Sequence, residues 1–219
     1  MAVNIKMIDH ENPEPQILKR AAELISQGEV IVCPTDTGYA FSANALDVKA
    51  IARIFVLKKR SYTNPIHVAV SSIAAAKKYA HINKAAKCLA DSFLPGALTM
   101  ILPRKEAIPA ILVDGRDTIG IRIPDNRVIL ALAAMTNLPL TTTSANISGR
   151  PTPYTVEEVV RQLQETAGIV ALVLNQGTIY PSELSTIVDL TFVPPRLLRQ
   201  GRISWEDIRS ALQSLEGQS

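Results

Sequence analysis

The stretch PQILKRAAELISQGEVIVCPTDTG, residues 15–38, contains the alternation that decides the fold. Apolar residues recur at helical spacing over residues 15–27, and Gly28 follows where a helix of that length would end. The next apolar run, residues 30–33, predicts a short buried strand, which Pro34 is expected to stop. A helix that leads directly into a buried strand is typical of a sheet covered by helices.

The rest of the chain continues this alternation. Further helices are predicted over residues 47–58, 72–79, 84–93, 128–135 and 155–165, with a final helix from residue 204. Further strands are predicted over residues 66–70, 98–102, 118–123, 140–143, 169–174, 186–190 and 196–199. Several connections are too short for helical crossovers, so some strands must be antiparallel. We therefore expect the α/β class: a single domain with a twisted, mixed parallel and antiparallel sheet flanked by helices.

The composition limits the classes of protein. The chain has 219 residues, of which 47% are hydrophobic, and its net charge is +3. This charge is too weak to coat nucleic acid by itself, but it does not repel an anionic substrate. Only 5% of residues are aromatic, which disfavours a surface built for base stacking. Because no apolar run approaches the roughly 20 residues of a membrane span and no secretion signal begins the chain, we expect a cytoplasmic protein with no membrane partner.

The chain lacks several common site motifs. Its two cysteines and three histidines show no metal-ligand spacing, so we expect no protein-bound metal. It also lacks the P-loop, the GxGxxG fingerprint and the GxSxG nucleophile elbow. Any nucleotide site must therefore follow another design.

Three polar segments carry candidate functional residues. Residues 34–40, PTDTGYA, place hydroxyls at a strand end, where ligands bind in open α/β sheets, although they also suit a plain turn. Lys58 and Arg60 end a helix, where cations either clamp phosphate or simply interact with the helix dipole. Ser144 and Asn146 face one way in an extended segment, which fits either a site for phosphate or phosphate-bound metal or a Ser/Thr-rich loop.

Strand alternation adds a further candidate. In the strand over residues 118–123, three isoleucines share one face, whereas Thr118, Gly120 and Arg122 share the other. Gly120 offers Arg122 little cover. Arg122 therefore suits the lining of a cleft as well as an ordinary surface position.

Taken together, these segments resemble the YrdC/YciO-like family, whose best-known activity is threonylcarbamoyl-AMP synthesis. Each shared motif is weak alone, but their joint order is specific. The motifs are Pro34-Thr35-Asp36-Thr37-x-Tyr39, Lys58-x-Arg60 with Asn64-Pro65, Pro95-Gly96-Ala97-Leu98-Thr99, Gly120-Ile121-Arg122-Ile123-Pro124-Asp125, Ser144-Ala145-Asn146-x-Ser148-Gly149, Ser185-Thr186-Ile187-Val188-Asp189 and Leu198-Arg199-x-Gly201. The resemblance implies a YrdC-like domain over residues 15–203 with a large, concave basic cavity, between an N-terminal extension (1–14) and a C-terminal helix and tail (204–219).

The resemblance also implies a reaction. L-threonine, bicarbonate and ATP would give threonylcarbamoyl-adenylate and pyrophosphate, with Mg²⁺ accompanying ATP. A separate transferase complex would then use the adenylate to modify certain tRNAs. The implied site residues are Lys58 and Arg60 (catalytic and nucleotide-binding), Ser144, Asn146, Ser185 and Arg199 (nucleotide-binding), and Thr35, Arg122 and His67 (substrate-binding).

Two positions depart from the usual family pattern. Residues 38–41 are Gly-Tyr-Ala-Phe, closer to the YciO branch than the usual Val-Tyr-Gly-Leu, and Ser61 replaces a proline. Both border the expected threonine pocket. One alternative is therefore a YciO-branch protein that binds double-stranded RNA or tRNA without this turnover, whose affinity would depend steeply on salt. Another is a different adenylation or carbamoyl transfer.

Overall fold

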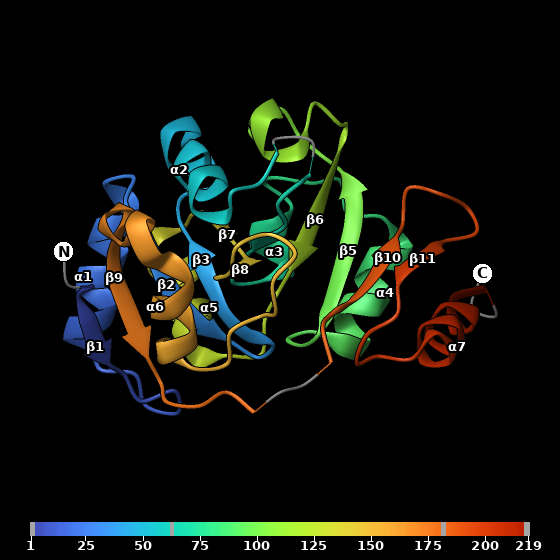
Figure 1. Ribbon diagram of the computed structural model, residues 1–219. Coiled ribbons are helices and arrows are strands. Elements are labelled where there is room, and N and C mark those ends of the chain that lie inside the picture. Colours follow the sequence, from blue (N-terminus) through green and yellow to red (C-terminus); the bar gives the residue numbers. More distant parts are fainter. Residues whose placement is uncertain (1–2, 62–63, 181–182, 217–219) are drawn as a thin grey trace.

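The computed structural model describes residues 3–61, 64–180 and 183–216, which form two hydrogen-bonded sheets and their covering helices (Figure 1). The helices are α1 (Pro15–Ser26), α2 (Val48–Lys58), α3 (Ile73–Ala76), α4 (Lys84–Phe93), α5 (Arg127–Thr136), α6 (Val156–Leu163) and α7 (Trp205–Glu216), with 3₁₀ turns η1 (Ala110–Val113) and η2 (Gln164–Ile169). The strands are β1 (Ile5–Met7), β2 (Val30–Thr35), β3 (Gly38–Ser42), β4 (Val68–Ala69), β5 (Leu98–Pro103), β6 (Thr118–Arg122), β7 (Leu140–Thr141), β8 (Thr143–Ser144), β9 (Val170–Asn175), β10 (Thr186–Asp189) and β11 (Arg196–Arg199).

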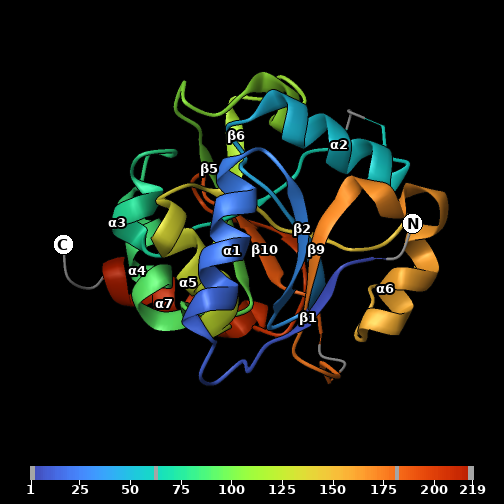
Figure 2. The same cartoon turned by 90° about the vertical axis from the view of Figure 1, so that its left-hand side faces the viewer.

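The five-stranded sheet is covered by helices on both faces. Its order is β1-β9-β2-β3-β8, with parallel pairing from β1 to β2 and antiparallel pairing beyond. Ile31 and Leu172 on one face are buried with α1 and α5, whereas Val32 and Val173 on the other face belong to the core that includes α2 and α6. Figure 2 shows α1 and α6 on opposite sides of β2 and β9. Burial on both faces explains why β2 is a continuous apolar run.

In the six-stranded sheet, helices cover one face, and the opposite face is covered only at the β4–β7 edge, where Ala69 and Leu140 pack with α5. Its order is β11-β10-β5-β6-β4-β7, again with mixed pairing. Met100, Ile121 and Val188 point into the main core, which also contains buried residues of α4 and α7. The opposite face presents Thr99 and Arg122, which are register partners across β5 and β6. This second face forms the floor of a cavity.

The two sheets meet at the segment that contains β7 and β8. The backbone N–H of Thr141 donates to the Ala43 carbonyl beside β3, and that of Thr142 donates to His67 beside β4, both at 3.0 Å. The expected α/β class and mixed pairing are confirmed. The strands divide into two ladders because β7 pairs with β4, whereas β8, one residue later, pairs with β3.

Some local expectations were wrong. β2 continues through Pro34 to Thr35, because β9 pairs only as far as Val32 and no neighbouring strand on that side needs an N–H from Pro34. Residues 34–40, for which a plain turn was one interpretation, contain the end of β2 and the start of β3 instead. No strand was predicted over residues 5–7, which form the edge strand β1.

Candidate functional site

A cavity of about 470 Å³ opens between β3 and β8 on one side and the uncovered face of the six-stranded sheet on the other. The predicted site residues that line it are Thr35, Arg60, His67, Arg122, Ser144, Ser185 and Arg199. Lys58 and Asn146 are not on the wall. They lie directly behind Ser144, to which both are hydrogen-bonded.

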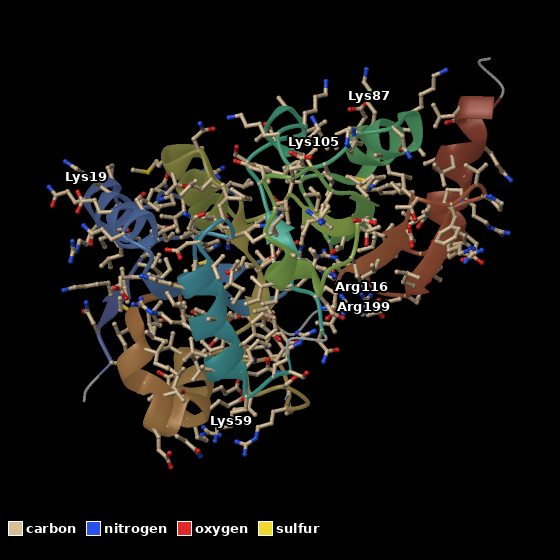
Figure 3. The ribbon with its side chains drawn as sticks, turned by 90° about the horizontal axis from the view of Figure 1, so that it is seen from above. Lys19, Lys59, Lys87, Lys105, Arg116 and Arg199 are labelled. Atoms are coloured by element: carbon tan, nitrogen blue, oxygen red, sulfur yellow. The ribbon has the colours of Figure 1, made fainter. Side chains whose placement is uncertain are left out.

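The wall of this cavity is rich in guanidinium groups. Arg60, Arg116, Arg122 and Arg199 all line it, whereas Asp189 contributes the carboxylate among the described lining residues. The Asp189 carboxylate already accepts hydrogen bonds from the backbone and hydroxyl of Thr191. Figure 3 shows Arg116 and Arg199 near one another when the molecule is seen from above. The charge on the wall therefore favours an anionic ligand.

Arg122 is held by the segment that follows β2. Its Nη2 donates to Asp36 Oδ1 at 2.6 Å, and its Nη1 donates to Thr37 Oγ1 at 2.8 Å. Both side chains of the ion pair are only 8% exposed. Burial lowers the pKa of Arg122, and the carboxylate of Asp36 acts in the opposite direction. The Nε of Arg122 is buried without a hydrogen-bond partner in the described part of the chain.

Lys58 organises the segment that carries Ser144 and Asn146. Its Nζ donates to the Ser144 carbonyl at 2.7 Å, to Asn146 Oδ1 at 2.8 Å and to the Asn146 carbonyl at 3.2 Å. Ser144 Oγ donates to the same Oδ1, and the Asn146 amide donates to Arg150. Burial, and next the charge of Arg60, lower the pKa of Lys58 to about 7. Lys58 thus fixes the predicted Ser-x-Asn motif from behind the cavity wall.

Arg60 reaches the cavity from the loop after α2. Its Nη2 donates to the Pro65 carbonyl at 3.3 Å, and its Nε is buried without a hydrogen-bond partner in the described residues. Lys59, the preceding residue, has a left-handed backbone with φ of 45° and an exposed side chain. The tight end of α2 therefore points neighbouring cations in different directions. Of Lys58, Lys59 and Arg60, only Arg60 lines the cavity.

His67 packs directly on Gly120. A Cβ atom on Gly120 would lie 2.4 Å from His67 Cδ2, so only glycine admits the imidazole here. Burial lowers the pKa of His67 to about 4, helped by the charges of Arg199, Arg60 and Arg122. His67 is therefore a neutral imidazole at pH 7.

The remaining predicted residues are engaged in local hydrogen bonds. Thr35 Oγ1 donates to the Gly38 carbonyl at 2.7 Å, which closes the turn between β2 and β3. Arg199 donates through Nε and Nη2 to the Ser185 carbonyl, and Nη2 also donates to Ser185 Oγ at 3.0 Å. Ser185 Oγ in turn lies 2.9 Å from Thr99 Oγ1.

Sequence reasoning missed several residues of the wall. Thr118 shares a strand face with Arg122, so alternation identified its direction but not its place in the cavity. Thr99 ends one of the ordered family motifs but was given no role in the site, and Arg116 comes from a loop that no motif marked. Their positions follow from the pairing of β5 with β6, which local sequence does not encode.

Within the described ranges, no group of three or more His, Cys, Asp or Glu residues is placed to hold a metal ion. No helix in this part of the chain has the length and apolar character required to cross a bilayer.

Comparison with known proteins identifies the family. The family model Sua5_yciO_yrdC, described as telomere recombination, matches residues 23–201. The chain belongs to the Sua5/YciO/YrdC family. The resemblance inferred from the ordered motifs is confirmed.

Relatives within the Sua5/YciO/YrdC family match most of the chain. A putative threonylcarbamoyl-AMP synthase of Methanocaldococcus jannaschii is 39% identical over 181 residues, 83% of this chain and 84% of that protein. The structure of Pyrococcus abyssi Sua5 complexed with L-threonine is 34% identical with a TM-score of 0.89, covering 95% of this chain but 60% of that one. E. coli YciO is 27% identical with a TM-score of 0.85, covering 94% of this chain and 100% of that one.

The departures from the usual family motif fall in different places. Gly38 and Ala40 line the cavity, whereas Ser61 is exposed. Gly38 has φ of 128°, and a Cβ there would lie 2.7 Å from Thr152 Cγ2. Glycine therefore allows the loop around Thr152 to close over β3, and a valine at this position would require that loop to move.

Proposed function

We propose that this chain is a threonylcarbamoyl-AMP synthase, which makes threonylcarbamoyl-adenylate and pyrophosphate from L-threonine, bicarbonate and ATP. The observation that carries the proposal is the convergence of Arg60, Arg122 and Arg199 on one cavity whose wall also includes Ser144. Relatives with the synthase name occur in archaea, bacteria and mammals at 32–39% identity, and they support this enzyme class.

The chemistry explains why such a cavity is needed. The amine of threonine attacks the carbon of bicarbonate, and water leaves as the carbamate forms. A carbamate oxygen then attacks the α-phosphorus of ATP, the bond to the β-phosphate breaks, and pyrophosphate leaves. Two unit charges 4 Å apart repel by about 4 kcal/mol near a protein surface, so the two anions meet only where cations offset this repulsion. Positioning and charge stabilisation then supply the rate without a protein nucleophile.

Different residues of the cavity bind the amino acid and the phosphates. Arg122, held by the turn that Thr35 closes, binds the carboxylate of threonine, and the neutral His67 faces the same substrate. Arg60 binds the phosphates and stabilises the charge that develops during transfer.

The nucleotide is held by residues from several segments. Ser144 binds the triphosphate, with Lys58 and Asn146 fixing it from behind and Lys58 adding its charge. Arg199 and Ser185 bind the nucleotide from β11 and the segment before β10.

Magnesium enters this scheme as part of the substrate. The described residues form no cage of carboxylates, and Mg²⁺ needs none, because it binds through phosphate oxygens and retained water. The hydroxyl-rich wall near Ser144 fits a hydrated ion that arrives on ATP. MgATP is therefore the proposed substrate.

The proposed product has a use outside this chain. We place the reaction in the cytoplasm, where a separate transferase complex uses the adenylate to modify tRNA. The names of the relatives do not favour the alternative of an RNA-binding protein without turnover.

The test measures pyrophosphate release from the purified full chain with MgATP, threonine and bicarbonate. We expect release that requires all three compounds, together with a product that has the mass of threonylcarbamoyl-adenylate. Reactions that lack one substrate, or that contain serine instead of threonine, are the controls. Release that is indifferent to threonine would refute the assignment.

A further inference from the structure

We propose that Asp36 is a positioning residue that reserves Arg122 for the carboxylate of the amino-acid substrate and keeps the phosphates of ATP away from it. This inference rests on the proposed synthase function. Asp36 does not line the cavity, so it acts through Arg122 and not by touching a substrate.

The geometry makes Asp36 a support on the far side of Arg122. Its carboxylate contacts Arg122 Nη2 at 2.6 Å, and it borders a separate hollow that also contains Asp125 and Arg202. Thr37 holds Nη1 from the adjacent position at 2.8 Å. The guanidinium is therefore fixed at two nitrogens, and its Nε has no hydrogen-bond partner in the described residues. A planar guanidinium held in this way offers the cavity a fixed geometry for binding a carboxylate.

The guanidinium groups of the cavity differ in whether a carboxylate neutralises their charge. Asp36 cancels the charge of Arg122, because both side chains are buried together. Arg60 and Arg199 form no ion pair in the described part of the chain, and Arg116 reaches Asp114 only at 3.9 Å. A polyphosphate is attracted most strongly by the unneutralised cations, whereas one carboxylate can bind a guanidinium whose charge is already cancelled.

This difference between the arginines explains why the carboxylate of Asp36 lies so near a cavity that binds anions. Without Asp36, Arg122 would be a buried cation with no counter-charge, and any small anion would compensate it. Phosphate and pyrophosphate would then compete with threonine. Asp36 thus supplies selectivity between the two substrates of one reaction.

The experiment compares Asp36→Asn with the wild type and with Glu29→Gln. Glu29 forms a 2.9 Å ion pair with Arg53 away from the cavity, so the control removes the same charge from another ion pair. We expect Asp36→Asn to raise the KM for threonine about ten-fold and to leave the KM for ATP within about two-fold. Inorganic phosphate should become a competitive inhibitor against threonine in this variant and not in the wild type.

Thermal unfolding would reveal whether Asp36→Asn fails to fold, and in that case a second variant tests the proposal. Asp36→Glu keeps the charge but displaces the carboxylate, so we expect a smaller rise in the KM for threonine with no new inhibition by phosphate. Equal changes in the two KM values, or no change in a folded variant, would overturn the role of Asp36. Wild-type release that ignores threonine would instead overturn the proposed function, so the two failures are distinguishable.

Discussion

The two sheets differ in what covers them. In the five-stranded sheet, helices pack on both faces, and every residue of β2 is buried. In the six-stranded sheet, the face opposite the core borders the cavity along β10, β5 and β6, and β6 alternates isoleucines with Thr118, Gly120 and Arg122. Arg122 and Thr99 therefore lie on a strand face that no helix covers, whereas the five-stranded sheet contributes Thr35 and Ser144 to the cavity only from the ends of β2 and β8.

Arg60→Ala on the cavity wall is expected to have the largest effect on activity. Removing a cation that stabilises developing charge should lower kcat/KM by about 10²–10³-fold. The matched control is Lys59→Asn, because Lys59 is exposed and asparagine tolerates its left-handed backbone. Steady-state pyrophosphate release measures both variants. Equal losses in the two variants would show that the charge of the loop matters and not the cavity.

The second change tests the covered sheet. Ile31 in β2 is fully buried, so Ile31→Ala should lower the free energy of unfolding by about 2–5 kcal/mol. Because Ile31 lies in the core beside α1 and α5, both KM values should stay unchanged at a temperature where the variant is folded. Urea unfolding and steady-state kinetics measure the two effects. A changed KM for either substrate would contradict the division between the sheets.

The third change tests the uncovered face. A Cβ in Gly120→Ala would lie 2.4 Å from His67 Cδ2, which forces the imidazole out of its present position on the cavity wall. We expect kcat/KM to fall about ten-fold, with unfolding affected less than by Ile31→Ala. Gly168→Ala is the control, because a Cβ there meets nothing within 4 Å. Identical kinetics for Gly120→Ala and the control would remove His67 from the site.

The smallest effect concerns the proton on Lys58. Its pKa of about 7 in the folded protein lies below the ordinary value of 10.5. Between pH 7 and pH 10.5 the unfolded chain therefore binds more protons than the folded protein, and the free energy of unfolding rises with pH. The negative charge of ATP opposes this shift by favouring the ammonium. At pH 8, the binding of ATP should therefore be accompanied by uptake of less than one proton per molecule on Lys58. The affinity of the protein for ATP should fall as the pH rises above 7.

Calorimetry in two buffers of different ionisation enthalpy measures this uptake. Lys58→Met should abolish the uptake, since methionine has a similar length and no proton to gain. Uptake that persists unchanged in Lys58→Met would assign the proton to another group.

Local sequence predicted much of the fold because most helices carry their own boundaries. Asp47 caps α2 and Thr155 forms a capping box with Glu158, so these starts were predictable. β3 was missed because Gly38 and its neighbours favour a turn locally, and only pairing with β2 and β8 makes the segment extended. β1 was missed because its partner, β9, lies far along the chain.

The candidate site shows the same limit. Alternation along β6 gave the face of Arg122, and the ordered motifs gave Arg60 and Ser144. The contact of Lys58 with Asn146 joins residues 88 positions apart, and that of Arg122 with Asp36 joins residues 86 apart. Such contacts depend on how the two sheets are placed relative to one another. The sequence therefore identified candidate residues, but it could not tell which of them line the cavity and which hold a lining residue in place.

The junction at β7 and β8 has a mechanical consequence. One short segment crosses from the six-stranded ladder to the five-stranded one, and Thr142, at the crossing, lines the cavity itself. A ligand that bridges Ser144 and Arg122 therefore clamps both sheets at their shared seam. Hydrogen exchange of the Thr142 amide, which is bonded to the His67 carbonyl, would report how firmly that seam is closed.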